Sequence, residues 1–158
     1  MIQLEPMTAS IWSSIMETRI PEYAAEQVCA GRWSEDEALE QANEEFQRLL
    51  PHGVNTGDHH IYSLVEQSTA ERVGYLWYME REKAGSPTVF LCDVRVFEPH
   101  RRLGYGAAAL QAFEQLVSER HGSTRIELHV FGSNHPARAL YTKLGFEETN
   151  VMMAKTLQ

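Results

Sequence analysis

Two arginines and two glycines stand together in the segment RRLGYG, residues 101–106, which runs into alanine and leucine. The pattern predicts that a helix begins here, and the first backbone N–H groups of a helix have no acceptor within it. These groups and the helix dipole attract anions. Gly104 and Gly106 let a ligand approach the backbone closely, and Arg101 and Arg102 add positive charge beside it. The segment therefore predicts a cradle for phosphate groups.

Other interpretations of this turn remain open at the level of the local pattern. A Walker loop ends in Gly-Lys-Ser/Thr, which this segment lacks. The dinucleotide fingerprint places a third glycine where Ala109 stands, and it follows the first strand of a parallel unit. The Gly-x-Gly pattern alone also fits a tight strand-to-helix turn that binds nothing.

Composition limits the class of protein. The 158 residues and 43% hydrophobic content predict a single domain over residues 1–158 with a core of its own. Residues 1–50 hold ten acidic and three basic residues, a net charge of −7, while residues 51–158 hold the other 12 and 11, a net of −1. Because nucleic-acid-binding domains carry an excess of positive charge, we expect no nucleic-acid partner.

Cysteine usage and hydropathy point to a soluble protein. Cys29 and Cys92 are far apart and form neither a disulfide framework nor a paired metal spacing. The N-terminus lacks a basic start followed by an apolar run, and no apolar stretch approaches the ~18 residues of a membrane span. We expect a cytoplasmic protein without membrane association.

Periodicity predicts the elements that position the turn. Pro21 is expected to break or restart the first helix, and Ser34 with Glu37 predicts a capping box at the start of the second. The predicted strands are 1–6, 61–67, 72–80, 87–97, 124–131 and 146–157, and the predicted helices are 8–31, 34–50, 106–122 and 134–145. The order β-α-α-β-β-β-α-β-α-β predicts one mixed α/β layer domain.

The last third of the chain extends the pattern of the turn. Arg101-x-x-Gly104-x-Gly106 is followed by Asn134 and then by ARALYTKLGF at 137–146. Together with the element order, this chain resembles the GNAT superfamily of acetyl-CoA-dependent N-acetyltransferases. The resemblance implies a mostly antiparallel central sheet with helices on both faces. One position departs from the family pattern, because many members have glycine where Arg102 stands.

The resemblance implies where acetyl-CoA would bind. The pyrophosphate would lie on the backbone amides of the turn, and the pantetheine arm would pair with the fourth strand like an added strand. Asn134 matches the family asparagine that contacts this arm, although a helix-capping role would also explain it. The implied coenzyme-binding residues are Val94, Arg95, Val96, Arg101, Arg102, Leu103, Gly104, Tyr105, Gly106, Ala107, Asn134 and Tyr141.

The resemblance also implies catalytic roles. Tyr141 matches the tyrosine near the coenzyme sulfur, where a phenol can donate a proton to the departing thiolate; packing in the core is the alternative. Some members carry a glutamate base on the fifth strand, and His129 stands there in Leu-His-Val. Histidine can accept a proton near pH 7, and alternation places His129 opposite the apolar face of its strand. Asp93 and Glu127 are rival bases, although a structural carboxylate is the favoured interpretation of Asp93.

Two further groups could in principle bind ligands. His59 and His60 are strand neighbours, so they should point to opposite faces and cannot easily share a metal; we predict no metal. Trp33, Trp77 and Tyr78 could line an acceptor pocket, but large aromatic residues more often belong to the core.

These features predict an N-acetyltransferase that moves the acetyl group of acetyl-CoA to a primary amine by direct attack in a ternary complex. We expect a small-molecule or peptide acceptor, and the acidic first third favours a cationic one. Homodimerisation would be compatible with the sequence. A non-catalytic coenzyme A-binding regulatory module is the alternative. A nucleotide-binding enzyme of another class would also retain the turn, but it would prefer a nucleotide to acetyl-CoA.

Overall fold

A sheet of five strands organises the first part of the chain, in the order β1-β2-β3-β4-β5. The computed structural model describes residues 1–121 and 125–158. The first three pairings are antiparallel and the pairing of β4 with β5 is parallel. The strands span Ile2–Pro6 (β1), His59–Glu66 (β2), Glu71–Lys83 (β3), Ser86–Val96 (β4) and Ile126–Leu128 (β5). The mixed, mostly antiparallel sheet predicted from the sequence is confirmed.

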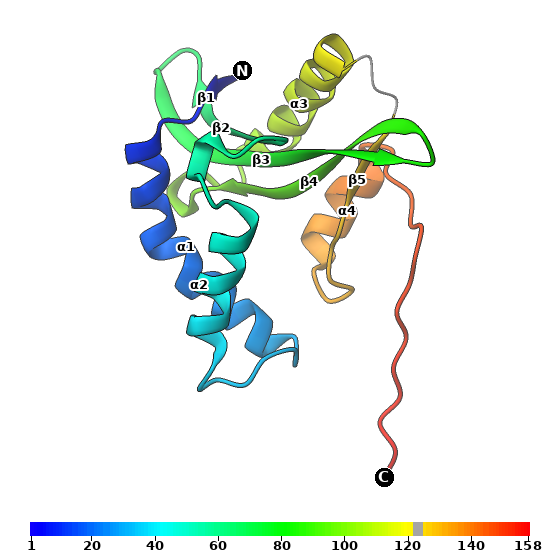
Figure 1. Ribbon diagram of the computed structural model, residues 1–158. Coiled ribbons are helices and arrows are strands. Elements are labelled where there is room, and N and C mark those ends of the chain that lie inside the picture. Colours follow the sequence, from blue (N-terminus) through cyan, green and yellow to red (C-terminus); the bar gives the residue numbers. More distant parts are fainter. Residues whose placement is uncertain (122–124) are drawn as a thin grey trace. The chain divides into compact units, whose positions relative to one another are not determined.

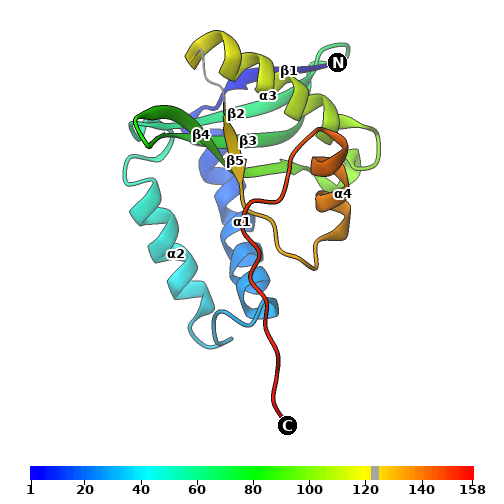
Figure 2. The ribbon, with the colours of Figure 1, turned by 90° about the vertical axis from the view of Figure 1, so that its right-hand side faces the viewer.

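Helices cover both faces of this sheet (Figures 1 and 2). α1 and α2 pack together on one face, and α3 lies on the other. These helices span Ala9–Cys29 (α1), Ala38–Leu49 (α2) and Tyr105–His121 (α3), and the short 3₁₀ turns span Gly53–Asn55 (η1) and Glu98–His100 (η2). In the part of the chain that the structure describes, no helix has the length and apolarity needed to cross a bilayer.

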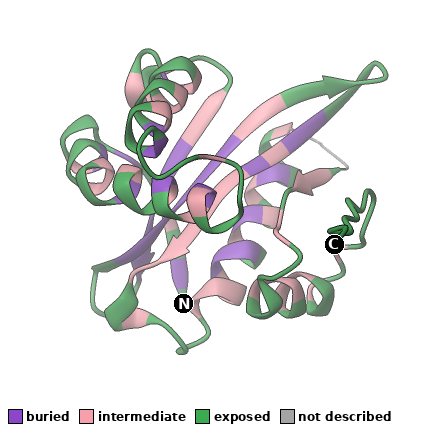
Figure 3. Ribbon diagram, turned by 90° about the horizontal axis from the view of Figure 1, so that it is seen from below, coloured by how far each residue is buried: buried purple, intermediate pink, exposed green. Residues whose placement is uncertain are grey.

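Figure 3 shows buried residues in the strands of the sheet and in the helices. The core has aromatic residues on each face of the sheet. On the α1 side, the ring of Trp12 packs edge-on against Tyr75 at 5.4 Å and Trp77 at 6.2 Å between centroids. On the α3 side, Tyr78 packs against Phe113 at 5.1 Å. Trp77 and Tyr78 are 3% and 0% exposed, so both are core residues.

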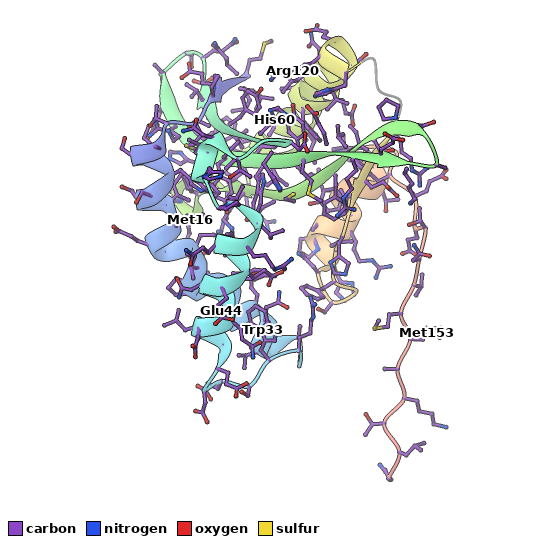
Figure 4. The ribbon with its side chains drawn as sticks, in the orientation of Figure 1. Met16, Trp33, Glu44, His60, Arg120 and Met153 are labelled. Atoms are coloured by element: carbon purple, nitrogen blue, oxygen red, sulfur yellow. The ribbon has the colours of Figure 1, made fainter. Side chains whose placement is uncertain are left out.

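The chain divides into two compact units, Met1–Leu128 and His129–Gln158. The second unit contains α4 (His135–Lys143). Residues 146–158 have no regular secondary structure, and the side chains of Val151, Met152, Met153 (Figure 4) and Leu157 are exposed. The predicted strand at 146–157 is therefore wrong. A strand requires a partner for its backbone groups, and residues 146–158 pair with no strand among the described residues.

Two predicted helix boundaries are also wrong. α1 continues through Pro21, which lies on its exposed side. A proline there can be accommodated because solvent-side helix hydrogen bonds already lengthen as a helix curves around a core. α2 begins at Ala38 without a side-chain cap, and residues 34–37 form a preceding turn in which the N–H of Glu37 donates to the carbonyl of Ser34. Packing of Trp33 against Tyr23 accompanies this turn.

Gly74 permits close approach of β3 and β4. A methyl group added at Gly74 would lie 2.1 Å from the carbonyl oxygen of Arg95, a backbone atom that cannot move away easily. We therefore expect Gly74→Ala to lower the free energy of unfolding by ~2 kcal/mol, measured by urea denaturation. Gly57→Ala is the matched control, because a methyl group there meets no atom within 4 Å. Equal stability of the two variants would contradict this account of Gly74.

His59 and His60 point to opposite faces of the sheet, as predicted. Nδ1 of His59 accepts a hydrogen bond from Nε1 of Trp77 at 2.9 Å on the α1 side. His60 stacks on Tyr78 on the α3 side, and its Nε2 lies 2.7 Å from Oε1 of Glu80. Figure 4 labels His60 and also Arg120, which comes from α3 and donates to the hydroxyl of Tyr62. Each histidine is thus part of a different layer.

The environment of His59 predicts a pH dependence of stability. Burial lowers the pKa of His59 below its ordinary value. The unfolded chain therefore takes up this proton at a higher pH than the folded chain, and stability should fall as the pH drops below ~6.5. His59→Gln keeps an acceptor for Trp77 and removes the titration. Between pH 7 and pH 5.5 the stability of this variant should therefore fall less than that of the wild type, with a difference of up to ~1.4 kcal/mol per pH unit. Urea unfolding at pH 7 and pH 5.5 tests this, and equal losses in both proteins would contradict it.

Candidate functional site

The backbone N–H groups of residues 102–107, in the turn and at the start of α3, have no hydrogen-bond acceptor in the part of the chain that the structure describes. β4 ends at Val96, η2 follows, and α3 begins at Tyr105. The first backbone N–H of the helix to bond within it is that of Ala108, which donates to the carbonyl of Gly104 at 3.1 Å. Gly104 adopts a φ of +84°, which glycine tolerates without strain. The geometry expected of an anion-binding helix start is present here.

The two arginines of the turn differ in what fixes them: a side-chain hydrogen bond for Arg101 and a left-handed backbone conformation for Arg102. Nε of Arg101 donates to the carbonyl of Val96 at 3.0 Å, which ties the turn to the end of β4. Arg102 adopts a φ of +63°, a left-handed conformation that costs a residue other than glycine roughly 1–2 kcal/mol. This is the position at which the chain departs from the glycine of the GNAT pattern. The exposed Arg102 therefore keeps the glycine-like backbone and adds a positive charge.

The strand that leads to the turn has an open edge. β5 pairs with β4 only at Val89, Phe90 and Leu91. Residues 94–96 pair with β3 on one side and with no strand on the other among the described residues. An extended ligand could add to this edge by backbone hydrogen bonding. The coenzyme-binding residues predicted on β4 and in the turn therefore all lie in the first unit and follow one another along the chain.

The other predicted residues lie in the second unit. β5 ends at Leu128, so His129 lies beyond the strand, and the alternation that placed it on a strand face does not apply. Its exposed ring packs edge-on against Phe131 at 5.0 Å. Asn134 caps α4, because its Oδ1 accepts a hydrogen bond from the N–H of Ala137 at 3.3 Å. Tyr141 lies on α4 with its ring against Phe146 at 5.6 Å. Thr124 and Gly122, the expected strand start and helix stop, lie outside the described residues.

Comparison with known proteins identifies the family. Residues 12–146 match the model of the Acetyltransferase (GNAT) family. The chain belongs to the GNAT family. It is 36% identical over 156 residues to YycN of Bacillus subtilis, named an uncharacterized N-acetyltransferase, with 99% of both chains covered. The crystal structure of YycN has a TM-score of 0.91 at 35% identity and covers 100% of this chain and 99% of that one.

Other relatives agree with this assignment. YdgE of the same bacterium, also named an uncharacterized N-acetyltransferase, is 29% identical over 154 residues, 98% of this chain and 97% of that one. An N-alpha-acetyltransferase of Sulfurisphaera tokodaii is 44% identical over 60 residues, 38% of this chain and 36% of that one. The resemblance, the fold class and the prediction of an acetyltransferase are therefore confirmed.

The two rival carboxylates of this GNAT enzyme are both ion-paired. Oδ2 of Asp93 lies 2.8 Å from Nε of Arg19. Oε2 of Glu127 lies 2.9 Å from Nζ of Lys83 and 3.4 Å from Arg125. The hydrogen bond from Lys83 is the main cause that lowers the pKa of Glu127. A carboxylate stabilised in its charged form is a poorer proton acceptor.

A charged network that the sequence does not predict lies between α1 and β4 of this GNAT fold. It consists of two arginines and three carboxylates, namely Arg19, Arg95, Glu22, Glu26 and Asp93. The one sequence feature that pointed to this network was the position of Arg19, which stands two helical turns after Trp12 on the same helix face. An arginine on the face that carries a buried tryptophan is either a helix-edge residue or a buried ion pair. Here it is buried, with 6% exposure.

Proposed function

We propose that this GNAT enzyme transfers the acetyl group of acetyl-CoA to a primary amine by direct attack in a ternary complex. The observation that carries the proposal is the open edge of β4, which continues within a few residues into the unpaired amides of the turn. An extended arm that ends in phosphates matches this arrangement of a strand edge followed by an anion site. The pyrophosphate would bind the backbone of residues 101–107, and the pantetheine arm would pair with Val94–Val96 and contact Asn134 and Tyr141.

The proposed reaction includes proton transfers as well as acetyl transfer. The amine nitrogen bonds to the thioester carbon, the C–S bond breaks, and the sulfur leaves as a thiolate. A protonated amine loses one proton before the attack and a second as the amide forms, and the thiolate gains one, so one proton is released overall. We assign the first deprotonation to His129 and protonation of the sulfur to Tyr141. A backbone amide of residues 94–96 would stabilise the oxyanion.

The charge of the first two helices supports a cationic acceptor. Residues 1–50 carry a net charge of −7, and α1 contacts β4 directly through the charged network. Exposed charges attract a diffusing cation over about one Debye length, ~10 Å at 0.1 M salt. The KM of a cationic acceptor should therefore rise with ionic strength, whereas that of a neutral acceptor should not.

A thiol-release assay with four amines tests the function. The amines are spermidine, kanamycin, glucosamine and the peptide Met-Ala-Ala with a free N-terminus, each with acetyl-CoA. We expect release of coenzyme A in step with an acetylated product, identified by mass spectrometry, for at least one of them. Binding of acetyl-CoA without any acetylated product would overturn the proposal in favour of a non-catalytic coenzyme A-binding module.

A further inference from the structure

The carboxylate of Asp93 is held by only one of its two oxygens. Oδ2 accepts a hydrogen bond from Nε of Arg19 at 2.8 Å and another from the hydroxyl of Tyr75 at 2.6 Å. Both donors are buried, with 6% exposure for Arg19 and 0% for Tyr75. Oδ1 accepts no hydrogen bond from the described residues, and the Asp93 side chain is 17% exposed. Asp93 is therefore fixed through Oδ2, while Oδ1 stays available to a donor.

Arg19 is itself held by a chain of ion pairs. Its two terminal nitrogens donate to both oxygens of Glu26, at 3.3 and 3.2 Å. Arg95 then bridges Glu26 at 2.7 Å and Glu22 at 3.0 Å. Buried ion pairs add little net stability, but removal of one partner is costly, so such a network defines geometry. The network holds three carboxylates and two guanidinium groups, and both of the latter are already paired.

The two donors to Asp93 keep their protons. Burial lowers the pKa of Arg19, but Asp93, Tyr75 and Glu26 more than offset this, so the pKa lies above its ordinary value. Burial, followed by Asp93, raises the pKa of Tyr75 well above its ordinary value. Both groups therefore remain hydrogen-bond donors across the physiological range.

Asp93 stands at the start of the open edge. The register of β3 and β4 shifts so that Trp77 faces Asp93 and Tyr78 faces Leu91, which leaves Cys92 as the extra residue of a bulge. Asp93 and Arg95 both reach α1, so they share the face that α1 covers. The free oxygen of Asp93 thus lies next to Val94–Val96, where the proposed function places the thioester.

We infer that Oδ1 of Asp93 binds the amine of the acceptor, and that Arg19 and Tyr75 are positioning residues that hold Asp93. The inference rests on the proposed function. An ammonium group would donate a charge-assisted hydrogen bond to Oδ1, and the neutral amine left after deprotonation can still donate one N–H while its lone pair attacks. No guanidinium of the network is free to bind an acceptor carboxylate. The site therefore selects amines that carry no carboxylate beside the reacting nitrogen.

Steady-state kinetics of two variants test the inference, with whichever of spermidine, kanamycin, glucosamine or Met-Ala-Ala is acetylated fastest. Asp93→Asn keeps the shape of the side chain and should raise the KM of the amine ~30-fold, while acetyl-CoA affinity by calorimetry changes less than twofold. Tyr75→Phe removes one donor to Oδ2 and should raise the same KM several-fold, again without a change in acetyl-CoA affinity. A purely structural role would weaken both substrates together.

The pair Tyr23 and Glu45 provides matched controls, because the hydroxyl of Tyr23 donates to Oε2 of Glu45 at 3.1 Å, and neither residue hydrogen-bonds to Asp93 in the part of the chain that the structure describes. Tyr23→Phe and Glu45→Gln should leave the KM of the amine within twofold of the wild type. A wild-type KM in both Asp93→Asn and Tyr75→Phe would overturn the inference, and so would equal losses of amine and acetyl-CoA binding. If Asp93→Asn does not fold, an unchanged KM in Tyr75→Phe is sufficient to overturn it. A wild-type enzyme that acetylates none of the four amines would instead refute the proposed function.

Discussion

Replacing Tyr141 by phenylalanine should lower kcat by ~10²–10³-fold, equivalent to ~3–4 kcal/mol of barrier. The change removes the hydroxyl that we propose as the proton donor to the departing thiolate, and it keeps the ring that packs against Phe146. Acetyl-CoA affinity should change little, because the phosphates would bind the backbone of the turn. Single-turnover kinetics should show the loss, since slow product release would mask it in the steady state.

Tyr105→Phe is a matched control for Tyr141→Phe. Tyr105 belongs to the turn, where only its backbone is assigned a role, so its kcat should stay within twofold of the wild type. The melting temperature of each variant separates lost chemistry from lost stability. A wild-type single-turnover rate in Tyr141→Phe would exclude the acid role and leave this tyrosine as a packing residue.

Replacing His129 by glutamine should lower the rate by ~10²-fold and change its pH profile. If His129 accepts the proton of the amine, kcat/KM should rise with pH across the range in which histidine loses its proton. That ascending limb should disappear in the variant. The hydrogen bond from Lys83 lowers the pKa of Glu127, which makes this carboxylate a poorer proton acceptor.

His135→Gln controls for the loss of an imidazole from the same unit. His135 begins α4 and has no assigned role, so its pH profile should match that of the wild type. An intact ascending limb in His129→Gln would remove His129 from the mechanism and transfer the role to solvent or to one of the two carboxylates.

The sequence predicts the centre of the sheet well, because its signals are local. Residues 73–78 of β3 are buried throughout, and the apolar run Val89–Leu91 lies in the centre of β4. The turn at 101–106 is also readable, since glycine has a specific conformational use at Gly104. The structure adds that Arg102 adopts a left-handed backbone conformation, which glycine reaches without strain, at the position where the family pattern has glycine.

Features that depend on distant partners could not be predicted. Arg19 and Asp93 are 74 residues apart, and nothing near either residue identifies the other. The same limit applies to the predicted strand at 146–157, because a segment forms a strand only where a neighbouring strand can pair with its backbone. At Ser34, the local capping signal is present, but the chain forms a turn and begins α2 four residues later.

Calorimetric titration with acetyl-CoA tests most directly whether the turn binds the coenzyme. Gly106 lies in the first turn of α3, where a branched side chain would stand between the backbone amides and a bound phosphate. Gly106→Val should therefore weaken acetyl-CoA binding more than tenfold. Ser118→Val is the control, because it places the same β-branched residue on the exposed side of the same helix and should leave affinity within twofold. Wild-type affinity in a folded Gly106→Val variant would contradict the assignment of the turn as the phosphate site.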